Sequence, residues 1–295
     1  MSEAPWCTVV AAATGERLAG SASRLRHWMM VEQPGPWGHD ALLESGFPSE
    51  IGRTLVAWGE DPGVRVLLIQ RRDRPAPSVR RCFAAFTGRR ERRLATFEIR
   101  DLRELLDLDI EALTRDRWQG FGDPLAHPLF LVCTHGKHDR CCARYGGPVG
   151  RALAQRPDVW ECSHVGGDRF AGNVVCFPEG LYFGRVTAES AARVVRAYEQ
   201  GFLTLEHFRG HSSHPPAVQA AEYELRVALG LLRVDDVVLD QHTSAADRRH
   251  RVVFRIPDGH RRTVDLREFT LDRRPLTCKA QRSHSPRTFV LEGIS

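Results

Sequence analysis

The sequence predicts an α/β fold in which one order of elements occurs twice, followed by a small α+β region. Three observations carry this prediction. Patterns of strand, helix, strand, hairpin and helix follow one another in residues 1–115 and again in residues 116–208. Residues 217–295 combine one helical stretch with several short strands. The chain of 295 residues is also longer than one hydrophobic core usually supports, which favours several units.

The first repeat is predicted from apolar runs and from the residues that end them. Its expected elements are a buried strand, a helix, a second strand, a hairpin and a short helix, at residues 27–32, 40–58, 64–69, 82–86 with 94–99, and 102–106. Pro48 is expected to break the first helix, because proline lacks an N–H and clashes with the preceding turn. Asp101 can cap the last helix, since its carboxylate accepts free backbone N–H groups.

The second repeat has the same elements in the same order. They are expected at residues 129–133, 141–156, 159–164, 174–177 with 181–186, and 188–200, with Thr187 as the cap of the last helix. This is the minimal order of a thioredoxin-like layer, in which helices cover a small mixed sheet. We therefore predict two tandem thioredoxin-like units, a degenerate one at 1–115 and one with a cysteine-rich loop at 116–208.

The rest of the chain is predicted to be a linker and an appendage. Residues 209–216 are polar, rich in histidine and closed by two prolines, which is typical of a linker. The appendage is the small α+β region at 217–295, and no motif in it indicates a function. Its helix is expected at 217–232 and its strands at 237–240, 251–256 and 263–266.

Composition excludes several classes of protein. Hydrophobic residues make up 42% and charged residues 27%, the balance of an ordinary soluble globular protein. The net charge of +5 is mild, and the arginine runs are short and mixed with acids, so nucleic-acid binding is not expected. No apolar run is long enough for a membrane span, and no leader pattern is present. We expect a cytoplasmic protein whose eight cysteines stay reduced and do not form a disulfide framework.

Two stretches carry the residues with distinctive chemistry. One runs from Cys133 to Cys142 and holds three cysteines and two histidines; the other, residues 161–170, holds Cys162, His164 and Asp168. Each follows the end of a predicted strand. Parallel neighbouring strands would bring the two loops together at one edge of the sheet. Thiolates gathered with an imidazole in a reducing compartment favour iron–sulfur or zinc binding.

The glycine pair Gly166–Gly167 fits this interpretation. Without a Cβ, the backbone can turn closely past an inorganic centre, and His164 and Asp168 can point toward the same atom. A plainer interpretation is a simple turn beside a hydrogen-bonded histidine. Other thiol chemistry fits less well, because a phosphatase loop needs arginine six residues after cysteine and Arg140 comes one position late. No pair of cysteines has the two-residue spacing of a thioredoxin disulfide.

The motifs Cys-Thr-His-Gly-Lys-His-Asp-Arg-Cys-Cys-Ala (133–143), His-Val-Gly-Gly-Asp-Arg-Phe-Ala-Gly-Asn (164–173) and Val-Glu-Gln-Pro-Gly-Pro-Trp-Gly (31–38) resemble the sucrase/ferredoxin-like family. The resemblance covers most of the chain and extends to fungal proteins with thioredoxin-like [2Fe–2S] ferredoxin domains. It implies that the second unit is ferredoxin-like and binds a [2Fe–2S] cluster. The residues it implies as ligands are Cys133, Cys142, His164 and Asp168.

Asp168 departs from the family pattern, which has a second histidine at this position. Carboxylate oxygen is harder than imidazole nitrogen and suits iron beside sulfide less well. Three outcomes follow: Asp168 binds all the same, Cys162 takes its place, or the cluster is lost and the site is vestigial or holds zinc. Cys141 is expected to pack inward beside Cys142.

The other distinctive residues have plainer interpretations. Cys7, Cys82 and Cys176 are expected to be core thiols. Cys278 is either a surface thiol or folds back toward the site. Several further residues are candidates for tuning the centre or for ordinary packing and solvation: Trp37, His135, His138, Arg140 and Arg169. The irregular spacing of His207, His211 and His214 argues against a metal tract.

The predicted function is therefore a [2Fe–2S] electron carrier that exchanges electrons with a separate redox partner protein. A cluster site does not by itself imply catalysis, and no Gly-x-Gly-x-x-Gly nucleotide loop is present. Two alternatives remain open. One is a zinc-bound or metal-free module for protein interaction, and the other is a thiol oxidoreductase that uses Cys133 or Cys142.

Overall fold

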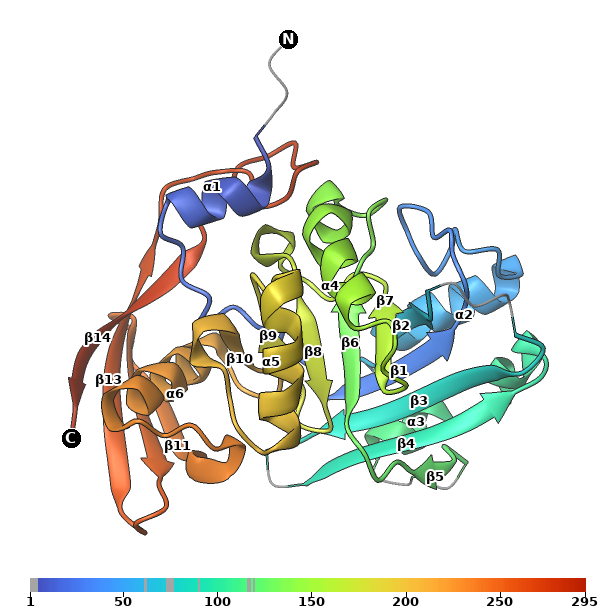
Figure 1. Ribbon diagram of the computed structural model, residues 1–295. Coiled ribbons are helices and arrows are strands. Elements are labelled where there is room, and N and C mark those ends of the chain that lie inside the picture. The colour runs from blue at the N-terminus through green and yellow to red at the C-terminus, as the bar shows by residue number, and fades with distance from the viewer. Residues whose placement is uncertain (1–4, 61–62, 73–76, 90, 116–117, 119) are drawn as a thin grey trace.

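The computed structural model describes residues 5–60, 63–72, 77–89, 91–115, 118 and 120–295 (Figure 1). Its helices are α1 (Cys7–Ala13), α2 (Ser49–Glu60), α3 (Ile110–Thr114), α4 (Gly147–Ala152), α5 (Ala188–Glu199) and α6 (Pro216–Leu229). Shorter helical turns are η1 (Leu102–Asp107), η2 (Cys142–Gly146), η3 (Asp168–Phe170), η4 (Leu205–His207) and η5 (Val234–Asp236). The unit boundary predicted at residue 116 lies outside the described residues.

Fourteen strands are present among the described residues, in two sheets. Those of the large sheet are β1 (His27–Glu32), β2 (Arg65–Gln70), β3 (Arg80–Thr87), β4 (Arg92–Ile99), β5 (Asp123–Pro124), β6 (Leu129–Cys133), β7 (Val159–Cys162), β8 (Val174–Phe177), β9 (Leu181–Phe183) and β10 (Phe208–His211). Those of the small antiparallel sheet are β11 (Val238–Ser244), β12 (Arg249–Arg255), β13 (Arg261–Thr270) and β14 (Arg287–Ile294).

The large sheet joins two groups of strands with the same pairing pattern. Its order is β10-β9-β8-β6-β7-β2-β1-β3-β4-β5. In the first group β1 is parallel to β2 and antiparallel to β3, and in the second β6 is parallel to β7 and antiparallel to β8. The groups meet where β2 pairs antiparallel with β7, at Ile69–Cys162 and Gln70–Glu161. The two groups therefore form one continuous ten-stranded sheet.

This sheet curls so that strands far apart in its order pack against each other. Trp28 on β1 makes an edge-to-face contact with Phe177 on β8, with ring centroids 5.0 Å apart, although three strands separate β1 from β8. At the ends of the curl, the hydroxyl oxygens of Thr87 and Ser212 are 2.9 Å apart. Large twisted sheets of this size usually curl, because the accumulated twist brings one face onto itself. The inner face is thereby buried without a covering helix.

Helices cover the outer face of the sheet. In the first group, α2, η1 and α3 pack on a core that includes Met29, Val31 and Leu68. In the second, α4 and α5 pack on residues of β6, β8 and β9. Helix α6 lies between β10 and the small sheet (Figure 1).

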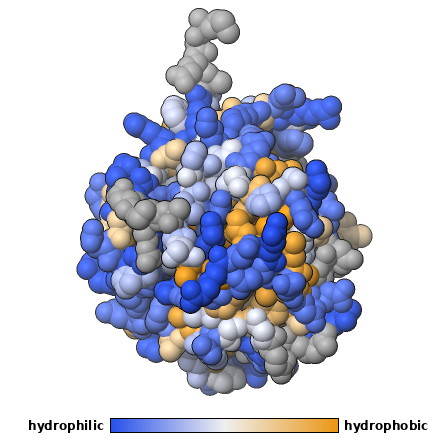
Figure 2. Space-filling model, turned by 90° about the vertical axis from the view of Figure 1, so that its right-hand side faces the viewer, coloured by the Kyte–Doolittle hydropathy of each residue, from blue (hydrophilic) through white to orange (hydrophobic). Residues whose placement is uncertain are grey.

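Figure 2 views the molecule from the right-hand side of Figure 1. On this face, hydrophobic side chains gather in one area with hydrophilic side chains around them.

Most predicted strands and both predicted caps are present. The Asp101 side chain accepts from the Arg103 N–H at the start of η1, and that of Thr187 accepts from the Ser190 N–H at the start of α5. In the appendage, the structure has α6 and four strands, of which β14 was not predicted. Among the described residues, no helix is both long and apolar enough to cross a membrane.

Two sequence predictions are wrong, and a third is right only in part. Residues 40–48 form turns, because the Asp40 carboxylate accepts the N–H groups of Leu42 and Leu43, and helix α2 begins only after Pro48. The helix predicted at 141–156 is present but ends at Ala152, and inside it the π turn η2 precedes the short α4. Residues 209–216 are not a linker, since β10 pairs with β9 and Ser212, Ser213 and His214 are buried.

Candidate metal centre

The two loops predicted to carry chemistry begin at the same edge of the sheet. Strands β6 and β7 are parallel, and Cys133 at the end of β6 lies opposite Cys162 at the end of β7. Both strands are buried along their whole length. The chain leaves both strands in the same direction, so residues 134–142 and 163–170 meet above the strand ends.

Cys142 returns to Cys133 through a close helix–strand approach. Cys142 begins the π turn η2, whose last residue is Gly146. A Cβ at Gly146 would lie 2.0 Å from the carbonyl oxygen of Cys133, which is impossible without movement of the backbone. Glycine at this position therefore lets the helix lie against the strand end. The result is that the ligand atoms of Cys133, Cys142 and His164 all lie within 4.8 Å of one another.

The loop after β7 is folded back by two glycines with left-handed backbones. Gly166 and Gly167 have φ values of +95° and +80°, which residues with a Cβ rarely adopt. The turn brings Nδ1 of His164 to 3.0 Å from Oδ1 of Asp168. The thiol of Cys142 lies 3.2 Å from the same Asp168 oxygen. The predicted convergence of His164 and Asp168 across this turn is thus present in the structure.

A buried arginine and an asparagine hold this loop in place. Nη1 of Arg209 on β10 donates to Gly166 O at 3.1 Å and to Oδ1 of Asn173 at 2.7 Å. Nδ2 of Asn173 in turn donates to Gly167 O at 2.9 Å. Arg209 is 1% exposed, and burial lowers its pKa to about 10. The sequence analysis predicted a role for neither residue. Arg209 was assigned to a linker, and the only indication for Asn173 was its place at the end of the motif at residues 164–173.

The four implied ligands differ in charge. The hydrogen bond from Cys142 lowers the pKa of Cys133 well below its usual value, while the same bond and burial raise the pKa of Cys142. Burial lowers the pKa of His164, but hydrogen bonds to Asp168 and Cys133 outweigh it and raise that pKa to about 9. Burial raises the pKa of Asp168, yet the bond from His164 leaves it below its usual value. Metal binding at His164 would displace its proton, so affinity here would rise with pH.

Cys162 and Asp168 were the two candidates for the fourth ligand. Both are buried. Within the described part of the chain, Asp168 belongs to a group of mutually close ligand atoms with His138 and His164, and Cys162 belongs to no such group. Burial raises the pKa of Cys162 well above its usual value. Of the two side chains, that of Asp168 is therefore the one that lies in a group of possible donor atoms.

His138 is a further candidate ligand that the sequence presented only as a tuning residue. Its ring stacks on that of His164, with centroids 3.9 Å apart and planes 16° apart. It comes from the loop after β6, and its position in the sequence gave no indication that its ring would stack on that of His164. His138 therefore offers a second imidazole beside His164 and Asp168.

The motif at residues 31–38 lies beside this site. Nε2 of His135 is 2.7 Å from Gly38 O, and the Trp37 and His135 rings meet edge to face at 5.8 Å. Nε1 of Trp37 donates to Gln33 O at 2.8 Å, which fixes the indole within the first strand group. Trp37 thus packs between the two groups and against the site loop at once. Arg169 pairs with Glu16, and Arg140 lies over the Trp6 ring.

The histidine side of the site faces a cleft of about 560 Å³. His135, His138 and His164 line it, together with His39 and the cations Arg24 and Arg65. Arg65 also donates to His164 O at 2.7 Å. The thiols of Cys133 and Cys142 are buried, whereas 17% of the His164 side chain is exposed. The imidazole edge is therefore the side of the site that solvent and other molecules can approach.

The remaining cysteines have two different environments. Cys82 and Cys176 lie in apolar cores, as predicted. Cys7 is buried as predicted, and its sulfur also faces the sulfurs of Cys141 and Cys278. Cys278 folds back toward the site loop, the second of its two predicted positions. His211 and His214 stack on each other in the core and belong to no group of metal ligands among the described residues.

Fold and site together define an α/β protein with a buried thiol and imidazole centre at the carboxyl ends of two parallel strands. The chain belongs to the sucrase/ferredoxin-like family, whose model matches residues 18–210. That span contains both groups of the large sheet and every residue of the candidate centre. It ends before α6 and the small sheet.

Similar proteins match a smaller part of the chain. Altered inheritance of mitochondria protein 32 from Meyerozyma guilliermondii is 32% identical over 96 residues, 28% of this chain and 34% of the relative. The protein of the same name from Clavispora lusitaniae is 32% identical over 100 residues, 30% of this chain and 37% of the relative. The chain thus spans about a third of the length of these curated relatives.

One solved structure was also matched. It is a variant of the thioredoxin-like [2Fe–2S] ferredoxin from Aquifex aeolicus, 17% identical, with a TM-score of 0.24. The match covers 28% of this chain and 96% of the ferredoxin.

Proposed function

We propose that this chain is an electron-transfer protein whose Cys133, Cys142, His164 and Asp168 hold a [2Fe–2S] cluster. The observation that carries the proposal is the convergence of two buried thiols and an imidazole, within 4.8 Å of one another, at the ends of β6 and β7. Thiolate and imidazole are the donors that iron–sulfur clusters take from proteins. The proposal includes the view that each strand group is a thioredoxin-like unit, of which the second carries the cluster.

The grouping of the donors supports two irons better than one ion. Cys133, Cys142 and His164 form one group, and His138, His164 and Asp168 form another that shares only His164. Among the described residues, no group contains all five side chains within 4.8 Å. When histidines replace two cysteines of a [2Fe–2S] centre, the two remaining cysteines bind one iron and the histidines the other. Cys133 and Cys142 suit the inner iron, and His164 with Asp168 suits the outer one.

His138 is the alternative to Asp168 at the outer iron. Asp168 is held by the His164 and Cys142 contacts described above, and its backbone oxygen also accepts from Thr8 at 3.1 Å. His138 would supply the softer donor that iron beside sulfide prefers. Loss of the cluster in Asp168→Ala with retention in His138→Ala would support Asp168, and the reverse would support His138.

The cleft beside the histidines is the proposed docking place of the redox partner. Electron transfer favours a short path from the cluster to the surface, and the His164 edge provides it. Arg24 and Arg65 outnumber Asp40, the carboxylate in the lining of this cleft, so an acidic surface on the partner protein would match it. We propose carriage of electrons in the cytoplasm and no catalytic step of the chain's own.

A thiol oxidoreductase is the weaker alternative. The low pKa of Cys133 would suit a nucleophile. However, Cys133 and Cys142 are 1% and 0% exposed, so an attacking disulfide has no access to either sulfur. A zinc-bound module remains the alternative if the protein proves colourless.

The test is the visible absorption spectrum of the full chain purified without oxygen, with iron and sulfide assayed on the same sample. We expect brown protein with about two irons and two sulfides per chain. The variant His164→Cys should keep the cluster but lower its reduction potential, because an anionic thiolate replaces a neutral imidazole. It should also flatten the pH dependence of the potential, since the imidazole proton is gone.

His127→Cys is the matched control, because His127 is exposed and its ring nitrogen lies 3.1 Å from the carbonyl oxygen of its neighbour Pro128, away from the candidate centre. Its spectrum and potential should equal those of the parent. Colourless protein that resists reconstitution with iron and sulfide would sink the cluster proposal. An unchanged potential in His164→Cys would remove His164 from the ligand set.

A further inference from the structure

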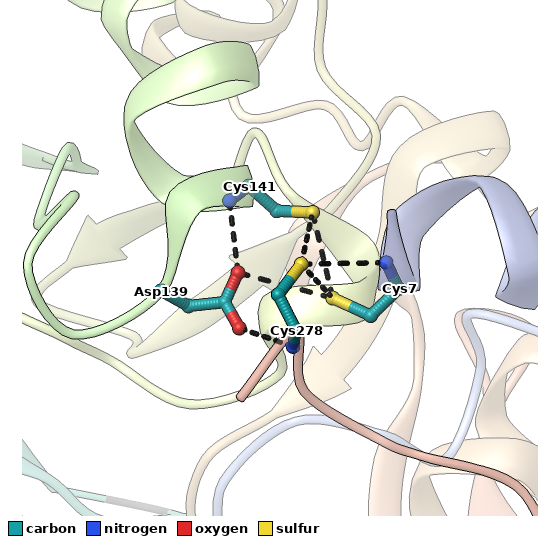
Figure 3. A group of neighbouring side chains, drawn as sticks. All are labelled: Cys7, Asp139, Cys141 and Cys278. Carbon is teal, nitrogen blue, oxygen red and sulfur yellow. Dashed lines mark hydrogen bonds between the residues drawn. The ribbon is translucent and has the colours of Figure 1, made fainter. Parts of the chain in front are cut away.

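A second group of cysteines lies beside the candidate metal centre and shares no residue with it. Figure 3 shows Cys7, Cys141 and Cys278 with their sulfur atoms pointing toward one another. The Sγ atoms are 3.4 Å apart for Cys7 and Cys141, 3.3 Å for Cys141 and Cys278, and 3.6 Å for Cys7 and Cys278. Cys7 and Cys141 are buried, and Cys278 is half-buried.

A buried carboxylate completes the group. Asp139 is fully buried. Its Oδ1 accepts the Cys141 N–H at 2.8 Å, and its Oδ2 accepts the Cys278 N–H at 2.6 Å (Figure 3). Oδ1 also lies 3.9 Å from the Cys7 sulfur. Each carboxylate oxygen has two lone pairs, so Oδ1 keeps one free after accepting the backbone N–H.

We propose that Cys7, Cys141, Cys278 and Asp139 bind a zinc ion in a closed, four-coordinate site. In a tetrahedral site with Zn–S bonds of about 2.3 Å, neighbouring sulfurs are about 3.8 Å apart. The three S···S distances are slightly shorter than this value, and all four donor atoms lie within 4.8 Å of one another. Three thiolates and one carboxylate leave no position open, which is the pattern of a structural zinc site.

Neither ordinary packing nor a disulfide explains this arrangement. Core thiols such as Cys82 lie among apolar side chains, whereas these three sulfurs, besides their apolar neighbours, face one another and a carboxylate. A disulfide would join two of the sulfurs at about 2.05 Å and leave the third without a partner. Three nearly equal distances of 3.3–3.6 Å instead describe three donors around one point.

The zinc site would fasten three segments that are far apart in sequence. Cys7 begins α1, Asp139 and Cys141 belong to the loop after β6, and Cys278 lies in the segment between β13 and β14. Helix α1 has seven residues and no side-chain N-cap, so it is too short to be stable by itself. Glu16 strengthens the same junction, since its carboxylate pairs with both Arg169 and Arg274.

This junction also supports the candidate cluster site from behind. Cys141 precedes Cys142, but the two side chains pack in different clusters, Cys141 with Cys7 and Cys142 with Cys133. Thr8, next to Cys7, donates to Asp168 O at 3.1 Å. Zinc at the second group would therefore fix the backbone of Cys142 and the position of Asp168 without touching the cluster. The second site is independent of whether the first binds a cluster.

The test is metal analysis of the full chain purified in reducing buffer with zinc supplied. A parent carrying Cys133→Ser and Cys142→Ser lacks the thiols of the candidate centre, so thiolate-bound zinc in it belongs to the second group. We expect about one zinc per chain in this parent. Adding Cys7→Ser and Cys278→Ser should remove it, and Cys82→Ala should leave it in place. Cobalt in place of zinc should show thiolate charge-transfer absorption that follows the same pattern.

Cys278→Ser alone covers the case in which the multiple variants fail to fold, because Cys278 is half-buried in a loop. In the otherwise unchanged chain it should weaken retention of zinc against a chelator by at least about tenfold. Equal zinc content and retention with and without Cys278→Ser would overturn the proposal, as would a disulfide among the three cysteines in protein purified with reductant. In the unmodified chain, zinc without iron would count against the cluster proposal alone, and iron without zinc would count against this one.

Discussion

The two strand groups of the large sheet share one topology but differ in chemistry. After β1, the chain enters a loop that contains no cysteine, and Trp37 and Gly38 of that loop contact His135 of the other group. After β6, the corresponding loop carries His138 and leads to Cys142. Identical strand pairing therefore does not decide where a metal centre forms. The loops after β6 and β7 bring the donor side chains of the candidate centre together, and the loop after β1 is a supporting loop that packs against one of them.

The largest expected effect tests how the ligand loop is held. Arg209→Leu would leave the carbonyl oxygens of Ser21 and Gly166 and the side chain of Asn173 without their buried donor. Each unpaired buried group costs about 1–3 kcal/mol, so we expect a loss of about 3 kcal/mol or more in unfolding free energy. Chemical denaturation measures the loss.

Arg193→Leu is the control for Arg209→Leu, since Arg193 is half exposed and pairs with Glu206 at the surface. It should change stability by less than about 1 kcal/mol. Iron content should fall in Arg209→Leu and stay unchanged in the control. Equal stability of the two variants would show that the arginine does not brace the loop.

A smaller effect is expected where the second group needs a close helix–strand approach. Gly146→Ala places a Cβ 2.0 Å from Cys133 O, so η2 must move away from β6. Overpacking of this kind costs about 1–3 kcal/mol. In the first group, Gly59 in α2 has room, because its Cβ would lie 3.9 Å from the nearest atom. Gly59→Ala should therefore be neutral or stabilising by up to about 1 kcal/mol.

The contrast between the glycines is measured by thermal unfolding of both variants beside the parent. Gly146→Ala should also lose iron, because Cys142 shifts relative to Cys133. Full iron content in Gly146→Ala would mean that the centre tolerates a displaced helix. The close helix–strand approach would then not be a requirement that sets the second strand group apart from the first.

The smallest effect is expected in the supporting loop. Trp37→Phe removes the hydrogen bond from Nε1 to Gln33 O but keeps an aromatic ring against His135. A lost hydrogen bond of this kind costs about 1 kcal/mol. The visible spectrum should be almost unchanged, since Trp37 contacts a neighbour of the ligands and not a ligand. Complete loss of the chromophore would show that the first strand group takes a direct part in holding the cluster.

The sequence predicted those features that depend on local pattern. The buried runs at 129–133 and 159–164 indicated strands, and parallel pairing then required their loops to meet. Of the helix predicted at 40–58, only the part after Pro48 formed, because the Asp40 carboxylate accepts the N–H groups of Leu42 and Leu43 and holds the earlier part in turns. Arg209 was assigned to a linker, since its burial depends on Ser21 and Asn173, which are distant in sequence. The contact of Cys7 with Cys278 spans 271 residues, a separation over which periodicity carries no information.

The two ends of the large sheet have a consequence for how copies of this protein meet. Its last strands are β5, two residues long with Pro124 in it, and β10, which α6 covers. Short, proline-bearing or covered strands are poor places for a strand from another chain to pair, so β5 and β10 oppose edge-to-edge aggregation of the ten-stranded sheet. The small sheet is less guarded. Its outer strand β14 exposes Val290 and Leu291, which makes this strand the place where crowded or partly unfolded copies would first associate.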